Sequence, residues 1–176
     1  MKIFDMSLES APTVTFNGWI EHHGDRYPVV DALGMLSHYW GRGLPKEWWW
    51  ISANQFDSAG ISVECTVLRS HVWGTKLHAP LGYLYYRNGT RSRLFISPPA
   101  RITVAGSPDA FEARAASTGG AQITLKATGR DYGSLGDGII NTLVGDLELW
   151  DGDSLVAQAR GTAALERRAD AGKSSA

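Results

Sequence analysis

Three side chains in this sequence have the chemistry to move a proton: His38, Tyr39 and Glu64. An imidazole gives and takes protons near neutral pH, so His38, beside a glycine-rich loop, is the first candidate for a proton donor or an orienting group. Tyr39 could donate a hydrogen bond to a phenol. The simpler alternatives are that His38 anchors the loop through a backbone carbonyl group and that Tyr39 is only packed.

Glu64 lies in residues 61–68, where apolar and polar residues alternate. The alternation predicts a half-buried antiparallel strand whose polar face, including Glu64, is solvated. If that face turned into an apolar interior instead, the carboxyl group could serve as an acid. Both interpretations remain open at the level of sequence.

The aromatic stretch from His38 to Phe56 holds four of the seven tryptophans. A strand that begins after Pro45 sends successive side chains to opposite faces, and both faces are apolar enough to need cover. One face mixes large rings with a hydroxyl and an amide, as a ligand pocket does. The predicted ligand-binding residues are those of this face and one loop tryptophan: Trp40, Trp48, Trp50, Ser52, Asn54 and Phe56. The alternative is a core strand whose Asn54 bonds a neighbouring loop.

Other kinds of site have little support. The pairs His22 with His23 and His71 with His78 stand without a second cysteine or a paired carboxylate motif, so we predict neither a metal nor another cofactor. Serine hydrolysis is excluded because there is no Gly-x-Ser-x-Gly elbow. Residues 133–138 resemble a phosphate-binding loop in composition alone.

Composition narrows the class of protein further. A chain of 176 residues predicts one domain, and a net charge of −1 argues against a nucleic-acid partner. The single cysteine, Cys65, suits burial in a reducing compartment, so we predict a cytoplasmic protein. Acidic residues interrupt residues 1–9 where a signal peptide needs an apolar run. No window approaches a membrane span, although contact with a membrane surface stays open.

Short β-prone runs separated by turn residues position these groups. The clearest hairpin joins two runs through Asn88-Gly89, and another turns near Gly24-Asp25. We expect residues 31–36 to lead into a loop marked by Gly41, Gly43 and Pro45, and a second loop at 129–141. The last strand is expected at 155–165, with a short helix at 162–171 as the alternative for the end of the chain. The sequence predicts an all-β fold, an antiparallel lipocalin-like β-barrel of about eight to ten strands over residues 1–166, with a disordered tail at 167–176. Such a barrel can enclose one small apolar ligand.

Several motifs resemble the second half of the tocopherol cyclase-like family. They are Gly18-Trp-Ile-Glu, Asp31-Ala, Trp40-Gly, Leu44-Pro45, Trp48-x-Trp50-x-x-x-Asn54-x-Phe56, Gly145-Asp-Leu147 with Trp150, and Ala163-Ala-Leu-Glu166. The resemblance covers roughly residues 16–166 and is most specific between 18 and 56. His38-x-Trp40-Gly is also similar to a signature of carotenoid hydratase-like two-barrel proteins.

The resemblance implies a lipocalin-like barrel that takes a long prenylated phenol, protonates its prenyl double bond and closes the phenol oxygen onto the cation. It implies no metal or nucleotide. The sequence departs from the family at Ser37-His38-Tyr39, where the family has Glu-Lys-Asn, and at Ser52, where it has glutamine. The family also has two barrel-like halves, whereas this chain supplies one.

The sequence therefore predicts binding of a hydrophobic, prenylated or polyketide-like small molecule, with acid-assisted cyclisation as the bolder hypothesis. Whether the chain is an enzyme is left open at this point. The alternative is a non-catalytic lipid carrier, or an accessory half of a composite two-barrel protein. A homodimer is one way to supply the missing half.

Overall fold

The computed structural model describes residues 6–41, 45–69, 71–72, 75–76 and 81–169. For residues 6–8, 39–41, 71–72 and 75–76 it describes the backbone and not the side chains. The strands in these ranges are β1 (Met6–His22), β2 (Asp25–Gly41), β3 (Glu47–Ala53), β4 (Ile61–Arg69), β5 (His71–Val72), β6 (Thr75–Lys76), β7 (Leu81–Asn88), β8 (Arg91–Ser97), β9 (Arg101–Gly106), β10 (Ala110–Ala116), β11 (Gln122–Thr128), β12 (Gly133–Gly136), β13 (Ile139–Asp151) and β14 (Ser154–Arg168).

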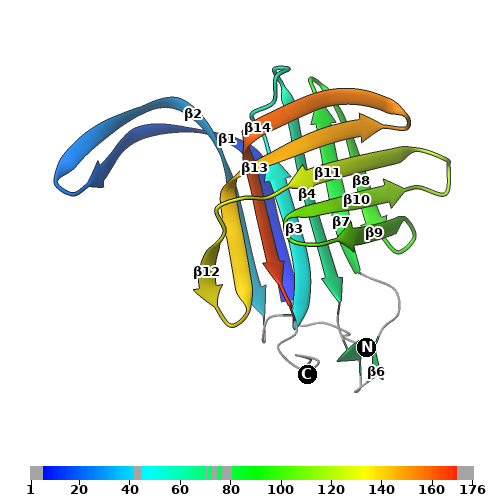
Figure 1. Cartoon of the computed structure of the whole chain (residues 1–176). Coiled ribbons are helices and arrows are strands. Elements are labelled where there is room, and N and C mark those ends of the chain that lie inside the picture. Colours follow the sequence, from blue (N-terminus) through cyan, green and yellow to red (C-terminus); the bar gives the residue numbers. More distant parts are fainter. Residues whose placement is uncertain (1–5, 42–44, 70, 73–74, 77–80, 170–176) are drawn as a thin grey trace.

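One antiparallel sheet of ten strands forms the body of the molecule (Figure 1). Its strands follow the order β8-β7-β4-β3-β14-β13-β11-β10-β9, with β12 paired to β13. The end strands β8 and β9 contact each other, so the sheet curls into a nearly closed barrel. The prediction of an all-β antiparallel barrel is therefore confirmed. None of the described segments is a helix that could cross a membrane.

The interior of the barrel is a packed apolar core. Alternating side chains from every long strand of the sheet point inward, as the period of two requires. The largest fully buried ones are Ile51, Leu84, Ile102, Ile123, Leu125, Leu147, Leu149 and Leu165. Trp49 packs against Phe111 with ring centroids 4.6 Å apart. These buried residues form one apolar core cluster on the inward side of the sheet, the side on which the ligand cavity was expected.

Strands β1 and β2 form a separate two-stranded hairpin of 17 residues per strand. Its turn lies at His23-Gly24, as predicted. Two register shifts interrupt the pairing, and beyond them the distal half projects from the barrel (Figure 1). At the second shift Asp31 adopts a positive φ of 49°, and its amide donates to Asn17 Oδ1 at 2.9 Å.

Two loop expectations were wrong, and of the two alternatives for residues 162–168 the strand is the one observed. Residues 31–41 belong to β2, because they pair along their length with β1. Residues 133–136 form the short strand β12 inside the expected loop. Strand β14 continues to Arg168 because β3 and β13 provide partners on both sides, so the alternative of a short helix from residue 162 fails.

Candidate functional site

The polar and aromatic face of β3 points away from the barrel interior. Trp49, Ile51 and Ala53 enter the core cluster instead. Trp48, Trp50 and Ser52 therefore lie on the opposite side of the sheet, which we call the outer face. The expectation that they line the barrel interior was wrong, because both faces of β3 are apolar and only the packing partners decide which one turns inward.

The strand register places chemically distinct side chains in two adjacent rows on the outer face. One row runs from β14 to β8 through Glu166, Trp50, Thr66, Tyr83 and Ile96. The next row runs through Ala164, Ser52, Glu64, Tyr85 and Leu94. Directly opposed residues of paired strands share a face with Cβ atoms about 5 Å apart. A carboxyl group therefore stands among aromatic rings and hydroxyls.

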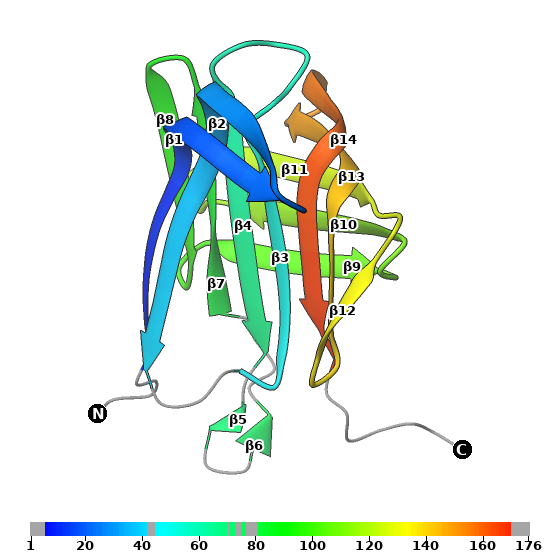
Figure 2. The ribbon, with the colours of Figure 1, turned by 90° about the vertical axis from the view of Figure 1, so that its left-hand side faces the viewer.

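Glu64 is only 1% exposed, so the prediction that it is solvated was wrong. Its Oε1 accepts a hydrogen bond from Trp50 Nε1 at 3.1 Å. Its Oε2 accepts one from the Ser10 hydroxyl of β1, at 2.5 Å. Figure 2, seen from the side of the hairpin, shows β1 and β2 in front of β3 and β4. Among the described residues no ion pair involves Glu64, so neutral donors alone hold this buried carboxyl.

Two further hydroxyls on β4 flank Glu64. Ser62 is 1% and Thr66 is 3% exposed, and neither hydroxyl oxygen has a hydrogen-bond partner within the described part of the chain. Both stand two residues from Glu64, so all three point to the outer face. A buried hydroxyl without a partner costs free energy, and a bound polar ligand would supply the missing bond.

Trp48 and Asn54 have structural partners. The indole N–H of Trp48 donates to Glu166 Oε1 at 2.8 Å. Asn54 Nδ2 donates to the carbonyl oxygens of Pro12 and Gly34, at 3.1 and 2.8 Å. Asn54 thus ties both hairpin strands to the end of β3, which is the alternative role expected for it, with strands in place of a loop.

Phe56 follows the end of β3 and packs, partly buried, against the core cluster. It therefore does not share the outer face with Trp50. The strand ends at Ala53, and beyond that point simple alternation no longer fixes the direction of a side chain.

The structure does not bring His38 to Glu64. His38 is exposed and lies opposite Glu9 on the hairpin, whereas the neighbouring pair Ser10 and Ser37 occupies the other hairpin face. Because Ser10 faces Glu64, the His38 side chain points away from it. The side chains of Tyr39 and Trp40 are outside the described part of the chain.

Cys65 occupies the core side of β4. Burial raises the pKa of its thiol to about 12, and the nearby Glu64 carboxylate adds to the rise. The prediction that this cysteine is buried is confirmed. A thiol with so high a pKa is a poor nucleophile.

Ser10, Ser62, Thr66 and the β7 tyrosines were not among the predicted site residues. The sequence could have located Ser62 and Thr66 in one way. The outer face of β3 is apolar and must be covered, and the neighbouring strand β4, which holds Ser62 and Thr66, lies under the same cover. No sequence feature marked Ser10, because its role depends on where a distant hairpin folds back.

This arrangement is suited to proton transfer. A buried carboxyl held by two neutral donors, beside aromatic rings, can deliver a proton to an apolar substrate away from bulk water. Nearby aromatic faces can stabilise a developing cation. Within the described residues no three His, Cys, Asp or Glu side chains gather as metal ligands.

Comparison with known proteins finds partial matches to one family. Residues 11–89 match the family model described as tocopherol cyclase-like, which confirms the resemblance over that part of the chain. A stretch of 49 residues is 37% identical to a probable chloroplastic tocopherol cyclase of Oryza sativa subsp. japonica. Over 49 residues the identity to the chloroplastic tocopherol cyclase of Zea mays is 39%.

These matches cover only part of the proteins compared. The aligned stretch is 28% of this chain and 10% of each curated relative. No solved structure matches the chain. The family match covers β1 from residue 11 onward, β2, β3, β4 and β7, so it includes Trp50 and Glu64 but not Ser10, β8 or β14.

Proposed function

We propose that this chain binds a hydrophobic, prenylated small molecule on the outer face beneath the hairpin and catalyses its acid-assisted cyclisation. The observation that carries the proposal is Glu64, a carboxyl that is 1% exposed, held by Trp50 and Ser10, and flanked by two hydroxyls without partners. The tocopherol cyclase-like match over these strands supports the same chemistry.

In the proposed reaction the Glu64 carboxylic acid protonates an alkene of the ligand's prenyl chain. The more substituted carbon becomes a cation, and a phenol oxygen of the same ligand attacks it. The new C–O bond closes a ring, and the phenol proton returns to the Glu64 carboxylate. No atom is gained or lost, so the reaction is an isomerisation that needs no oxidant, reductant or co-substrate.

The outer face offers the ligand two kinds of surface. The Trp50 ring, Tyr83 and Tyr85 lie beside Glu64 in the two rows and suit the reacting end of the molecule. Leu94 and Ile96 of β8 are 58% and 53% exposed and continue the same rows. They form an apolar shelf along which a prenyl tail could lie.

The proposal is tested by Glu64→Gln, with Glu166→Gln as matched control, because each glutamate accepts an indole N–H on the same face. Turnover of a prenylated hydroquinone is followed by chromatography, and binding by tryptophan quenching. We expect Glu64→Gln to keep binding and lose roughly 10²- to 10⁴-fold in turnover. Glu166→Gln should keep both. Undiminished turnover by Glu64→Gln would remove this residue from the mechanism.

A carrier would give a different result. It would quench its tryptophans on binding the same hydroquinone and return the compound unchanged. That outcome, seen with the unsubstituted chain, would reject catalysis and retain the ligand site.

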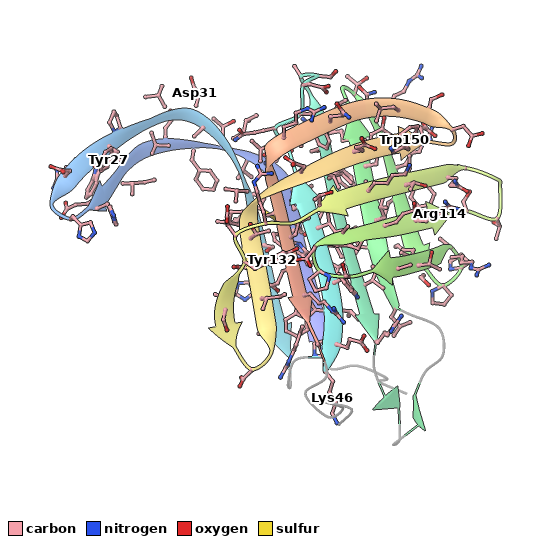
Figure 3. The ribbon with its side chains drawn as sticks, in the orientation of Figure 1. Tyr27, Asp31, Lys46, Arg114, Tyr132 and Trp150 are labelled. Atoms are coloured by element: carbon pink, nitrogen blue, oxygen red, sulfur yellow. The ribbon has the colours of Figure 1, made fainter. Side chains whose placement is uncertain are left out.

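The hairpin favours a second candidate function, in which two copies of this chain associate and each supplies one barrel of a two-barrel assembly. Seven large apolar side chains on it are exposed, so its projecting half lacks the cover that a two-stranded ribbon needs. They are Phe16, Trp19, Ile20, Tyr27, Val30, Leu33 and Leu36. Figure 3 shows Tyr27 on this segment, away from the barrel.

A second copy of this chain is the proposed occupant. Residues 16–33 carry three carboxylates against one arginine, which disfavours an anionic membrane. Strands β7 and β8 carry three arginines and no acid, so the hairpin of one copy complements the shelf of another and would close the open side of its site. Sedimentation should show a dimer that Val30→Ser weakens and Leu143→Ser, exposed elsewhere, does not. A monomer at all concentrations would reject this candidate.

A further inference from the structure

We infer that the outer face holds a second polar subsite next to Glu64, formed by Arg87 and Ser62, which takes a carboxylate or similar oxyanion of the ligand. This inference rests on the proposed ligand site and adds the class of molecule: an acidic prenylated aromatic in place of a neutral phenol.

The strand register brings the two residues together. Ser62 of β4 and Arg87 of β7 are directly opposed, so they share the outer face and their Cβ atoms are about 5 Å apart. Glu64 and Tyr85 form the neighbouring opposed pair on the same two strands and the same face. The subsite is therefore adjacent to the proposed proton donor.

Both members have polar atoms without partners. Arg87 Nε and Ser62 Oγ are buried, and within the described part of the chain neither makes a hydrogen bond. Ser62 is 1% exposed, so water cannot freely serve its hydroxyl. No ion pair among the described residues involves Arg87, and both carboxylate oxygens of Glu64 already have donors.

A third donor comes from the hairpin. The hydroxyl of Thr13 is also buried without a partner. It follows Pro12, whose carbonyl oxygen is bound by Asn54 at the end of β3, so Thr13 lies where the hairpin meets the outer face. Strands β1, β4 and β7 thus each contribute one donor that makes no hydrogen bond within the described residues.

An oxyanion satisfies such a set better than a neutral group does. Each buried polar group left unpaired costs free energy, which a hydrogen bond to the ligand would recover. A carboxylate offers two oxygens and about four acceptor positions, and its bond to a guanidinium is charge-assisted. A neutral ester or phenol can accept fewer bonds and brings no charge for Arg87. Acidic ligands should therefore bind more tightly than their esters.

The test compares a prenylated hydroxybenzoic acid with its methyl ester, using tryptophan quenching and calorimetry on the full chain. We expect the unsubstituted protein to prefer the acid by roughly tenfold or more. Arg87→Met, which keeps the apolar stem, should abolish that preference. Arg91→Met, at an exposed arginine of β8, is the matched control and should retain it. Ser62→Ala, a smaller change, should reduce the preference and gives an independent check should Arg87→Met not fold.

The outcomes separate this inference from the one on which it rests. Equal binding of acid and ester by the unsubstituted protein overturns the oxyanion subsite and leaves the ligand site intact. Retention of the acid preference by folded Arg87→Met also overturns it. Binding of neither compound rejects the proposed ligand site and this inference together.

Discussion

Three glutamates outside the core each accept an indole N–H, namely Glu64, Glu148 and Glu166, and the first and last of them differ in their surroundings. Glu166 is bonded by Trp48, and Arg168 lies over the ring of that tryptophan at 5.3 Å. Glu64 is bonded by Trp50 but is flanked by hydroxyls without partners. The pairing itself therefore does not mark the candidate acid. Glu64 differs in that it is buried beside the hydroxyls of Ser62 and Thr66, which make no hydrogen bond among the described residues.

Also at the scale of single residues, the reactivity of the Cys65 thiol tests whether the core side of β4 is accessible to reagents in the folded protein. Because burial raises the pKa of this thiol to about 12, only about 10⁻⁴ of it is thiolate at pH 8. We expect no reaction of the native chain with a thiol-specific disulfide reagent over minutes, and one thiol per chain once guanidinium unfolds it. Rapid labelling of the native protein would contradict the burial of β4.

Of the site residues, the sequence pattern located Glu64, Trp50 and Ser52 but assigned them to different surfaces. Trp50 was expected inside the barrel and Glu64 in solvent, whereas both lie under the hairpin. Alternation determines which residues share a face and not which face is covered, because the cover comes from residues distant in sequence. Asn54 was predicted to bind the ligand, whereas its observed bonds to Pro12 and Gly34 fit the alternative of a structural anchor, since an amide needs partners wherever it is buried.

At the scale of elements, the contact between β4 and β7 leaves no room for a side chain at Gly82. A Cβ there would lie 2.0 Å from the Thr66 carbonyl oxygen. We expect Gly82→Ala to lower the free energy of unfolding by about 2 kcal/mol or more, because the strands must separate. Urea unfolding followed by tryptophan fluorescence measures the change.

The control for Gly82 is Gly119→Ala. The nearest atom to a Cβ at Gly119 is 3.8 Å away, so the change should stay within about 0.5 kcal/mol. Equal stability of the two variants would show that β4 and β7 are not as closely paired as described.

Asp146 stabilises the part of the β13–β14 hairpin in which the register shifts near Gly145 and Leu147. Its Oδ1 accepts the Gly161 amide at 2.6 Å, and Arg130 donates to Oδ2 at 2.8 Å. The Gly161 bond, helped by Arg130, lowers the pKa of this carboxyl below its ordinary 3.8. A lowered pKa in the folded state stabilises the fold above the ordinary pKa, and the effect is lost as pH falls through the folded value.

Asp146→Asn should therefore cost about 1 kcal/mol at pH 7, since the carboxyl is partly exposed. The gap from the unsubstituted protein should narrow as pH falls below about 3.8. Urea unfolding at pH 7 and pH 3 checks this sign, and a gap that widens at pH 3 would refute the assignment.

At the scale of the whole molecule, the all-β barrel could be predicted because it follows from local patterns: short alternating runs, turns such as Asn88-Gly89, and no helical period. The 17-residue strands of the hairpin could not, because its distal half has almost no burial to impose a pattern. A hollow interior was expected from the number of strands, whereas the described inward-facing side chains form one packed apolar cluster. Strand number sets the diameter of a barrel, and side-chain size decides what remains of the space.

The filled interior can be tested with Leu125→Ala. Leu125 is fully buried in the core cluster, so truncation should cost about 2–5 kcal/mol in the free energy of unfolding. Leu143→Ala, at a side chain that is 68% exposed, should change little. Urea titration of both variants measures the difference, and a small loss at Leu125 would indicate space around it.

Strand edges carry backbone donors and acceptors that can pair with another chain. The barrel places its end strands β8 and β9 against each other, whereas β1 and β2 pair only with each other. Each hairpin strand therefore presents one long unpaired border, interrupted only at its register shifts. Fibrillar aggregation of this protein is thus expected to begin by pairing of β1 and β2 between molecules, while the barrel domain of each molecule stays folded.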